Sequence, residues 1–196
     1  MTGRKRGAAG QNPYEQKRGA AGQTPSEIEQ LTERQDRLRR ITITIVAGAL
    51  ILALYSMIFS FSAQDGEQSG GLSAYISERC VELLNLLSGK HWTESFMQSL
   101  AEYFEHPIRK LAHFGEYAAL AMLIYILLRQ WMDRGKKLFV IIVVWVFLSA
   151  AADEFHQYFV PGRWSSPADV LLDTCGGVFG MMCLVIAEKW RAKRRR

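Results

Sequence analysis

The sequence contains few cysteines, and their spacing does not suggest a metal centre. Cys80, Cys175 and Cys183 are the three in 196 residues, and none of their separations matches the pairs that hold zinc. Cys175 and Cys183 lie in an apolar run, where a free thiol behaves as a small hydrophobic side chain. The sequence therefore predicts neither a disulfide nor a redox role for these residues.

Charge is absent from one long segment, and large apolar side chains are nearly absent from another. Residues 41–63 (ITITIVAGALILALYSMIFSFSA) carry no charge over 23 residues, whereas residues 1–40 are polar. A helix of 23 residues is about 34 Å long, enough to cross a hydrocarbon core of about 30 Å. A secretory signal peptide is the competing interpretation, but its apolar region spans only about 7–15 residues. The sequence favours an uncleaved membrane anchor.

Three further apolar runs reach spanning length when the polar residues beside them are included. They predict spanning helices over 108–130, 138–157 and 167–187. Three short buried helices of a soluble protein are the alternative, but the first run fixes the chain in a membrane and charge bounds each later run. The predicted fold is all-α: a polytopic membrane protein with four transmembrane helices.

Lysine and arginine in the short flanks predict the orientation in the membrane. Nine lie in residues 1–40, four in 129–137 and six in the tail 188–196, whereas 64–107 contains only two and 158–166 only one. Both termini are therefore predicted to be cytoplasmic. The net charge of +5 gathers at the ends of apolar runs and not on a face shared with aromatic side chains, so we expect membrane lipids and not nucleic acid as partners.

The leader contains a near-repeat, KRGAAGQNPYEQ followed by KRGAAGQTPSEIEQ, with few groups to bury. Residues 1–23 are therefore predicted to be a disordered basic leader. Thr24, a proline at the first helical position and Glu27 form the pattern of a capping box, which predicts a juxtamembrane helix over 24–40. The basic end of this helix is expected to contact anionic lipid.

The segment 71–105, between the first two spanning helices, has helical periodicity and is predicted to be an extracytoplasmic amphipathic segment. One apolar stripe consists of Ile76, Cys80, Leu83, Leu84 and Leu87, and a second of Phe96, Leu100 and Phe104. Such stripes either pack on the domain or lie in the membrane–water interface. Both interpretations place a lid over the outer end of the bundle.

Ionisable side chains crowd the predicted outer ends of the last three spanning segments, while the inner halves are nearly free of charge. They recur at spacings of three or four residues, which makes them neighbours on a helix surface. Burying these stripes against each other avoids the cost of charge in lipid and predicts a polar cavity that opens outward. The stripes comprise Lys110, His113 and Glu116; Asp153, His156 and Gln157; and Asp169 and Asp173.

Two helix N-termini, after Pro107 and at Pro167, are predicted at the same surface, and such ends favour anions. Together with fixed positive charge they suit a phosphate or carboxylate head group. The predicted ligand-binding residues are Gln64, Arg109, Lys110, Glu154, Gln157, Arg163 and Asp169. The predicted acid–base residues, which are also candidates to bind a divalent metal such as Mg²⁺ or Zn²⁺, are His113, Glu116, Asp153, His156 and Asp173.

A structural network of salt bridges is the alternative for the whole set. Asp169 follows Ser166 by three residues and is also placed to complete a capping box. Glu154 points away from the stripe of its own helix, so it is expected to pair with Arg163 or with a residue of the lid. Two histidines of the lid segment, His91 and His106, are expected at the surface.

Gly176 and Gly180 form a small-xxx-small pair, which indicates a close contact between helices. They belong to one of three motifs that together resemble the VanZ-like family, named for a bacterial teicoplanin-resistance protein: FSAQDGEQSGGLS, RKLAHFGEYAALAML and ADEFHQYFVPGRWSSPADVLLDTCGGVFG. The resemblance covers residues 41–187 and implies a small multi-pass protein of the cell envelope, in some members linked to resistance against lipid-bearing glycopeptides. The family pattern maps onto Ser62, Gln64, Lys110, His113, Glu116, Asp153, Glu154, Gln157, Arg163, Asp169 and Gly177.

Three functions follow as hypotheses. The first is binding or modification of an anionic, lipid-linked envelope molecule at the outer leaflet. The second is a hydrolase or transferase that uses the carboxylates and histidines as acid and base; the chain lacks an elbow motif with a serine beside a base, although Ser62 offers a hydroxyl. The third, a transporter or channel, fits least, because no inverted repeat is evident and the inner helix halves offer no polar path.

Overall fold

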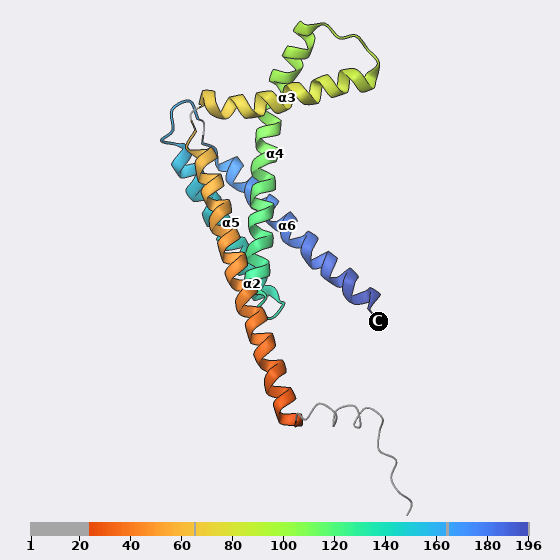
Figure 1. Cartoon of the computed structure of the whole chain (residues 1–196). Helices are drawn as coiled ribbons and strands as arrows, with labels where there is room; N and C mark the ends of the chain where they lie inside the picture. The colour runs from red at the N-terminus through yellow and green to blue at the C-terminus, as the bar shows by residue number, and fades with distance from the viewer. Residues whose placement is uncertain (1–23, 65, 164, 196) are drawn as a thin grey trace, which may run out of the picture. The chain divides into compact units, whose positions relative to one another are not determined.

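The computed structural model describes residues 24–64, 66–163 and 165–195, and these residues form five helices and no strand (Figure 1). The predicted disordered leader, 1–23, lies outside the described residues. Four helices are long and apolar enough to cross a membrane, as the sequence predicted. These four are α2 (Pro25–Ser62), α4 (Glu94–Leu128), α5 (Lys136–Gln157) and α6 (Pro167–Arg194), and α3 (Gly66–Ser88) follows the first of them.

The chain divides into two units, residues 1–42 and 43–196, and α2 belongs to both. In the first unit the capping box is present as predicted. The backbone N–H of Thr24 donates to a carboxylate oxygen of Glu27 at 2.7 Å, and the N–H of Glu27 donates to the Thr24 hydroxyl at 3.3 Å. The two bonds satisfy orphan backbone donors at the start of α2.

The core of the second unit is built by α4, α5 and α6. Leu120 and Ile124 of α4 and Ile142 and Val146 of α5 are almost fully buried, because they recur on the inward face of their helices. A Cβ atom at Gly180 would collide with the backbone carbonyl of α4. The predicted small-residue contact is therefore real, and it brings the α6 backbone directly against α4.

Besides Ile51, which belongs to the buried core, the part of α2 in the second unit makes polar side-chain contacts with the rest of the bundle. The hydroxyl groups of Tyr55 and Ser149 lie 2.5 Å apart, and the indole N–H of Trp145 donates to the Tyr55 hydroxyl at 3.0 Å. Nearer the other end, the indole N–H of Trp131 donates to the Thr44 hydroxyl at 2.9 Å. These bonds fix α2 against the bundle at two levels.

Helix α3 crosses the end of the bundle at which α2 and α5 finish and α6 begins (Figure 1). We call this the α3 end. The predicted helix N-terminus after Pro107 is wrong, because α4 runs without a break from Glu94 through Pro107 to Leu128. Proline removes one backbone hydrogen bond, and the turns on both sides of it keep the helix continuous. Of the two predicted helix N-termini, only that of α6 is present at the α3 end.

Candidate functional site

All twelve predicted site residues lie at the α3 end, but they do not share one cavity. Ten of them, with nine additional residues, line two small adjoining cavities. The first, which we call the polar cavity, encloses about 180 Å³ and is lined by His106, Arg109, Lys110, His113, Glu154, Gln157, Gly162, Arg163, Asp169, Leu172 and Asp173. The second, the α3 cavity, encloses about 90 Å³ and is lined by Phe61, Gln64, Leu72, Ser73, Ile76, Ile108, Arg109, Ala112, His113, Glu116 and Arg163.

One side of the polar cavity is formed by the start of α6. Ser166 is the N-cap residue, and its hydroxyl accepts from the N–H of Ala168 at 3.2 Å. The carboxylate of Asp169 pairs with Lys110 of α4 at 2.5 Å, so this residue links two helices. Glu154, which we expected to pair with Arg163 or the lid, instead accepts from the backbone N–H of Ser166 at 2.9 Å. A buried carboxylate of α5 thus holds the cap of α6.

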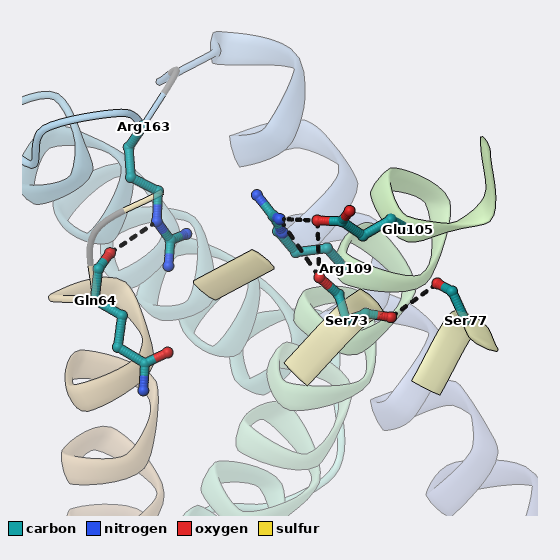
Figure 2. Close-up of polar contacts among 6 residues, drawn as sticks. All are labelled: Gln64, Ser73, Ser77, Glu105, Arg109 and Arg163. Carbon is teal, nitrogen blue, oxygen red and sulfur yellow. Dashed lines mark hydrogen bonds and ion pairs between the residues drawn. The ribbon is translucent and has the colours of Figure 1, made fainter. Parts of the chain in front are cut away.

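Arg163, in the connection between α5 and α6, ties three segments together. Its guanidinium donates to the backbone carbonyl groups of Phe61 at 2.5 Å and Gln64 at 3.2 Å, both at the end of α2, and to the side-chain oxygen of Gln157 at 3.3 Å. The contact with Gln64 is drawn in Figure 2. Burial, and secondly the neighbouring Arg109, lower the pKa of the Arg163 guanidinium from its ordinary value. A guanidinium nevertheless stays charged in proteins, so this cation is permanent.

Arg109 occupies the opposite wall and is bound by α3. Its guanidinium donates to Glu105 at 2.6 Å and to the Ser73 hydroxyl at 3.4 Å, and the same hydroxyl donates to Glu105 at 3.3 Å (Figure 2). The Ser77 hydroxyl in turn donates to the backbone carbonyl of Ser73 at 2.8 Å. The Arg109 Nε atom is buried and has no hydrogen-bond partner among the described residues. Arg109 therefore has an unused donor.

His113 and Glu116 lie deeper in the α3 cavity and contact each other without a hydrogen bond. The Nδ1 atom of His113 is 3.5 Å from a carboxylate oxygen of Glu116, and both atoms are buried without a hydrogen-bond partner among the described residues. Asp173 reaches the polar cavity from α6 with only 2% of its surface exposed, and its Oδ1 atom also lacks a partner in the described part of the chain. Unpaired buried polar atoms are costly, so they mark candidate sites of function.

Asp153 and His156 face a different space from the other predicted site residues. They line an apolar groove of about 820 Å³ that runs along α5 beside α2, at its part nearest the α3 end. The ring of His156 lies 4.7 Å from that of Phe59, and its Nδ1 atom is 3.4 Å from the Ser62 hydroxyl. Asp153 accepts from the Gln157 amide at 2.9 Å, which connects the groove to the polar cavity. The prediction that all the acids and imidazoles face one pocket is therefore wrong for these two.

No three His, Cys, Asp or Glu side chains within residues 24–64, 66–163 and 165–195 are grouped closely enough to hold a metal ion. Of the buried carboxylates, Asp153 instead accepts from the Gln157 amide and Glu154 from the backbone N–H of Ser166. The described side chains thus provide no ligand set for the divalent metal that the sequence allowed.

Several functional contacts were missed by sequence reasoning. Glu105 lies four residues before Arg109, and this spacing in the sequence predicts their ion pair on a helix. His106, expected at the surface, is exposed and also lines the polar cavity. Ser73 and the carbonyl groups that bind Arg163 have no sequence signal, because any residue can supply a backbone carbonyl.

Comparison with known proteins agrees with the resemblance read from the motifs. A family model described as VanZ/LLP1 matches residues 47–188, which include α3, α4 and α5, most of α6 and the last part of α2. No curated protein and no solved structure matches the chain. Because the family match covers most of the sequence, the chain belongs to the VanZ/LLP1 family.

Proposed function

We propose that this VanZ/LLP1-family membrane protein binds the anionic head group of a lipid-linked envelope molecule at the α3 end. The single observation that carries the proposal is the position of two arginines. Arg109 and Arg163 come from different segments, and both line the polar cavity and the α3 cavity. A phosphate or carboxylate between them would receive charge-assisted hydrogen bonds from both guanidinium groups.

The electrostatics of the site favour this ligand. Two like charges raise each other's energy in a partly buried setting, and an anion between them relieves the repulsion. Arg109 has a buried Nε donor without a partner in the described residues, so an incoming oxygen would satisfy a group that the protein leaves unpaired. The carboxylates of Glu105 and Asp169 neutralise part of the positive charge of Arg109 and Lys110. The attraction for an anionic head group is thereby limited, so that the head group can also dissociate.

The size of the hollows limits what enters them. Their volumes, about 180 and 90 Å³, are below the range of about 300–1,000 Å³ that is usual for pockets that bury a whole small molecule. A head group fits, and the hydrocarbon part of the ligand would stay in the bilayer. Lysine and arginine are sparse at this end, so we place the α3 end outside the cell and both termini in the cytoplasm. Sequestering or altering such a molecule would contribute to glycopeptide resistance of the teicoplanin type.

A pair of substitutions in one ion pair tests the proposal. Purified protein in nanodiscs is titrated with a fluorescent polyprenyl phosphate, and the affinity is compared for the wild type, Arg109→Gln and Glu105→Gln. Loss of a buried charged hydrogen bond costs about 1.5–3 kcal/mol, so Arg109→Gln should weaken binding by about 10- to 100-fold. Glu105→Gln frees the same guanidinium and should leave the affinity unchanged or raise it.

The two substitutions break the same contact, so a purely structural role predicts that they act alike. Equal loss of binding and equal loss of thermal stability in both variants would contradict the proposal. Titration with a neutral lipid of the same chain length is the control for binding through the hydrocarbon part alone. In cells, the binding-deficient variant should also lose any protection against teicoplanin that the wild type confers.

An enzymatic function is favoured by one observation, the contact between His113 and Glu116 beside the proposed anion position. A histidine beside a carboxylate is an arrangement expected of a general acid or base. If the protein is a hydrolase or transferase, His113→Gln should keep ligand affinity within about threefold and abolish product formation from the bound lipid. Loss of affinity without any detectable product in the wild type would favour the binding protein.

A further inference from the structure

The strongest feature that the proposed function leaves unexplained is the outer face of α3. The inner face of this helix carries Ser73, Ser77 and Val81, which are buried against the bundle. The apolar stripe predicted from the sequence, which includes Ile76, Leu83 and Leu87, lies on the face of α3 that points away from the bundle. Leu83, Leu86 and Leu87 are exposed by 55%, 77% and 74% respectively. Packing of the stripe on the domain, one of the two alternatives allowed by the sequence, is therefore absent within the described residues.

The exposed face is broad and nearly free of charge. Leu72, Ile76, Leu83 and Leu87 follow each other at spacings of four, seven and four residues, which places them on one side of a helix. Arg79 lies among them and is held by Glu82 at 2.5 Å, with its guanidinium over the ring of Tyr75. An apolar patch of this extent is unfavourable in water and marks a surface that contacts something else.

We infer that α3 lies in the membrane–water interface, with this apolar face inserted at the boundary between head groups and acyl chains. Figure 1 shows α3 lying across the end of α2, a helix that can span a membrane, and across α4, whose first turns continue beyond α3. The end of a spanning helix lies at the head-group layer, so a helix that crosses it runs along that layer. An amphipathic helix with a broad apolar face is typical of proteins that lie in this plane. The occupant is thus a lipid surface and not a second protein chain.

The inference goes beyond the proposed function, because it concerns how the site is reached. Leu72 and Ile76, from the apolar face, also line the α3 cavity beside Arg109 and Arg163. If α3 lies in the interface, this cavity opens sideways into the head-group layer. A lipid head group could then enter without leaving the membrane. That consequence depends on the proposed ligand, whereas the position of α3 does not.

The native cysteines provide a direct test. Cys80 lies on α3 and is exposed, so Cys175→Ala and Cys183→Ala leave it as the single cysteine for a nitroxide label. Collision of the label with oxygen, which concentrates in lipid, is compared with collision with a water-soluble nickel chelate in proteoliposomes. The matched control carries Cys80→Ala and Glu78→Cys, a label on the same turn but away from the apolar stripe. The oxygen-to-nickel ratio should be several-fold higher at residue 80 than at residue 78.

Two results would overturn the inference. Equal, water-like ratios at both positions would place α3 in the aqueous phase. Spin–spin broadening at residue 80 that disappears on dilution with unlabelled protein would show that a second copy covers the face. A Leu87→Cys label in the Cys80→Ala background reports on the same face independently, should either label disturb the fold. None of these readouts requires ligand binding, so the inference and the proposed function fail or succeed separately.

Discussion

The two ends of the helices in the second unit both carry charge, but they treat it in opposite ways. At the α3 end, Asp153, Glu154 and Asp173 are buried: the first two accept from an amide and a backbone N–H, and the third leaves an oxygen unpaired within the described residues. At the opposite end, Lys136 and Lys189 are exposed, as are most of the neighbouring basic side chains. Buried charges cost stability unless they are paired, whereas long basic side chains at a helix end reach the head groups at little cost. The α3 end, where buried charge costs stability, is therefore the better candidate for the functional site.

The close contact between the backbones of α4 and α6 lies between these two ends, and breaking it should have the largest effect. At Gly180 an added Cβ would collide with the backbone carbonyl of Ala118. Gly180→Ala is expected to lower the free energy of unfolding by about 3 kcal/mol, because a backbone cannot yield as a side chain can. Thermal unfolding in detergent, followed by tryptophan fluorescence, measures the change.

Gly115→Ala is the matched control, since a Cβ at Gly115 of α4 meets no atom within 4 Å. There the substitution should stabilise the protein by about 0.5–1 kcal/mol through helix propensity. The same chemical change would then act in opposite directions at two helix positions. A similar small effect at both glycines would mean that α6 does not pack directly on the α4 backbone.

Substitution of Arg163 should have the next largest effect on stability, and this effect should be confined to the α3 end. Arg163→Gln removes the donors to two carbonyl groups at the end of α2, and we expect a loss of about 2–3 kcal/mol. Arg163→Lys keeps the charge but not the planar fork, so it should recover less than half of this stability. Limited proteolysis between α2 and α3 reports the release of the segment. An unchanged cleavage rate in Arg163→Gln would show that these bonds do not hold α2 in place.

The smallest expected effect is the difference in coupling free energy between two ion pairs, one from each end. Lys110–Asp169 joins two helices at the α3 end, and Arg134–Glu188 joins α6 to the connection before α5 at the other. The Lys110 and Asp169 side chains are 36% and 22% exposed, against 49% and 34% for the other pair. Double-mutant cycles with Gln and Asn should give a coupling of about 1 kcal/mol for the first pair and about 0.5 kcal/mol or less for the second. A stronger coupling for Arg134–Glu188 would contradict the expectation that the less exposed pair at the α3 end contributes more stability.

Much of the architecture could be predicted because the bilayer imposes simple constraints. The charge-free run at 41–63 and the three later apolar runs have the length that a spanning helix needs, and a helix able to span occupies each position. The capping box at Thr24 and the close contact at Gly180 were also predictable, since each depends on residues three or four apart on one helix.

The remaining features depend on tertiary contacts that the sequence does not record. Pro107 was read as a helix start, yet α4 continues through it because the flanking turns persist. The apolar stripe of α3 faces outward while serines face the bundle, since Ser73 binds Arg109 and Glu105 there. His156 was grouped with the polar cavity by its spacing, but the rotation of α5 turns it toward α2. Periodicity identifies a stripe, and only packing decides what the stripe faces.

The most direct test of the central claim is to locate an anionic lipid on the protein. A polyprenyl phosphate with a photoactivatable group next to its phosphate is cross-linked to the protein in nanodiscs, and the adducts are mapped by mass spectrometry. Our account predicts adducts in residues 105–116 and 157–169, which surround the polar cavity and the α3 cavity, and their loss in Arg109→Gln. Adducts concentrated in residues 129–137 and 188–195, where exposed basic side chains attract any anionic lipid, would contradict it.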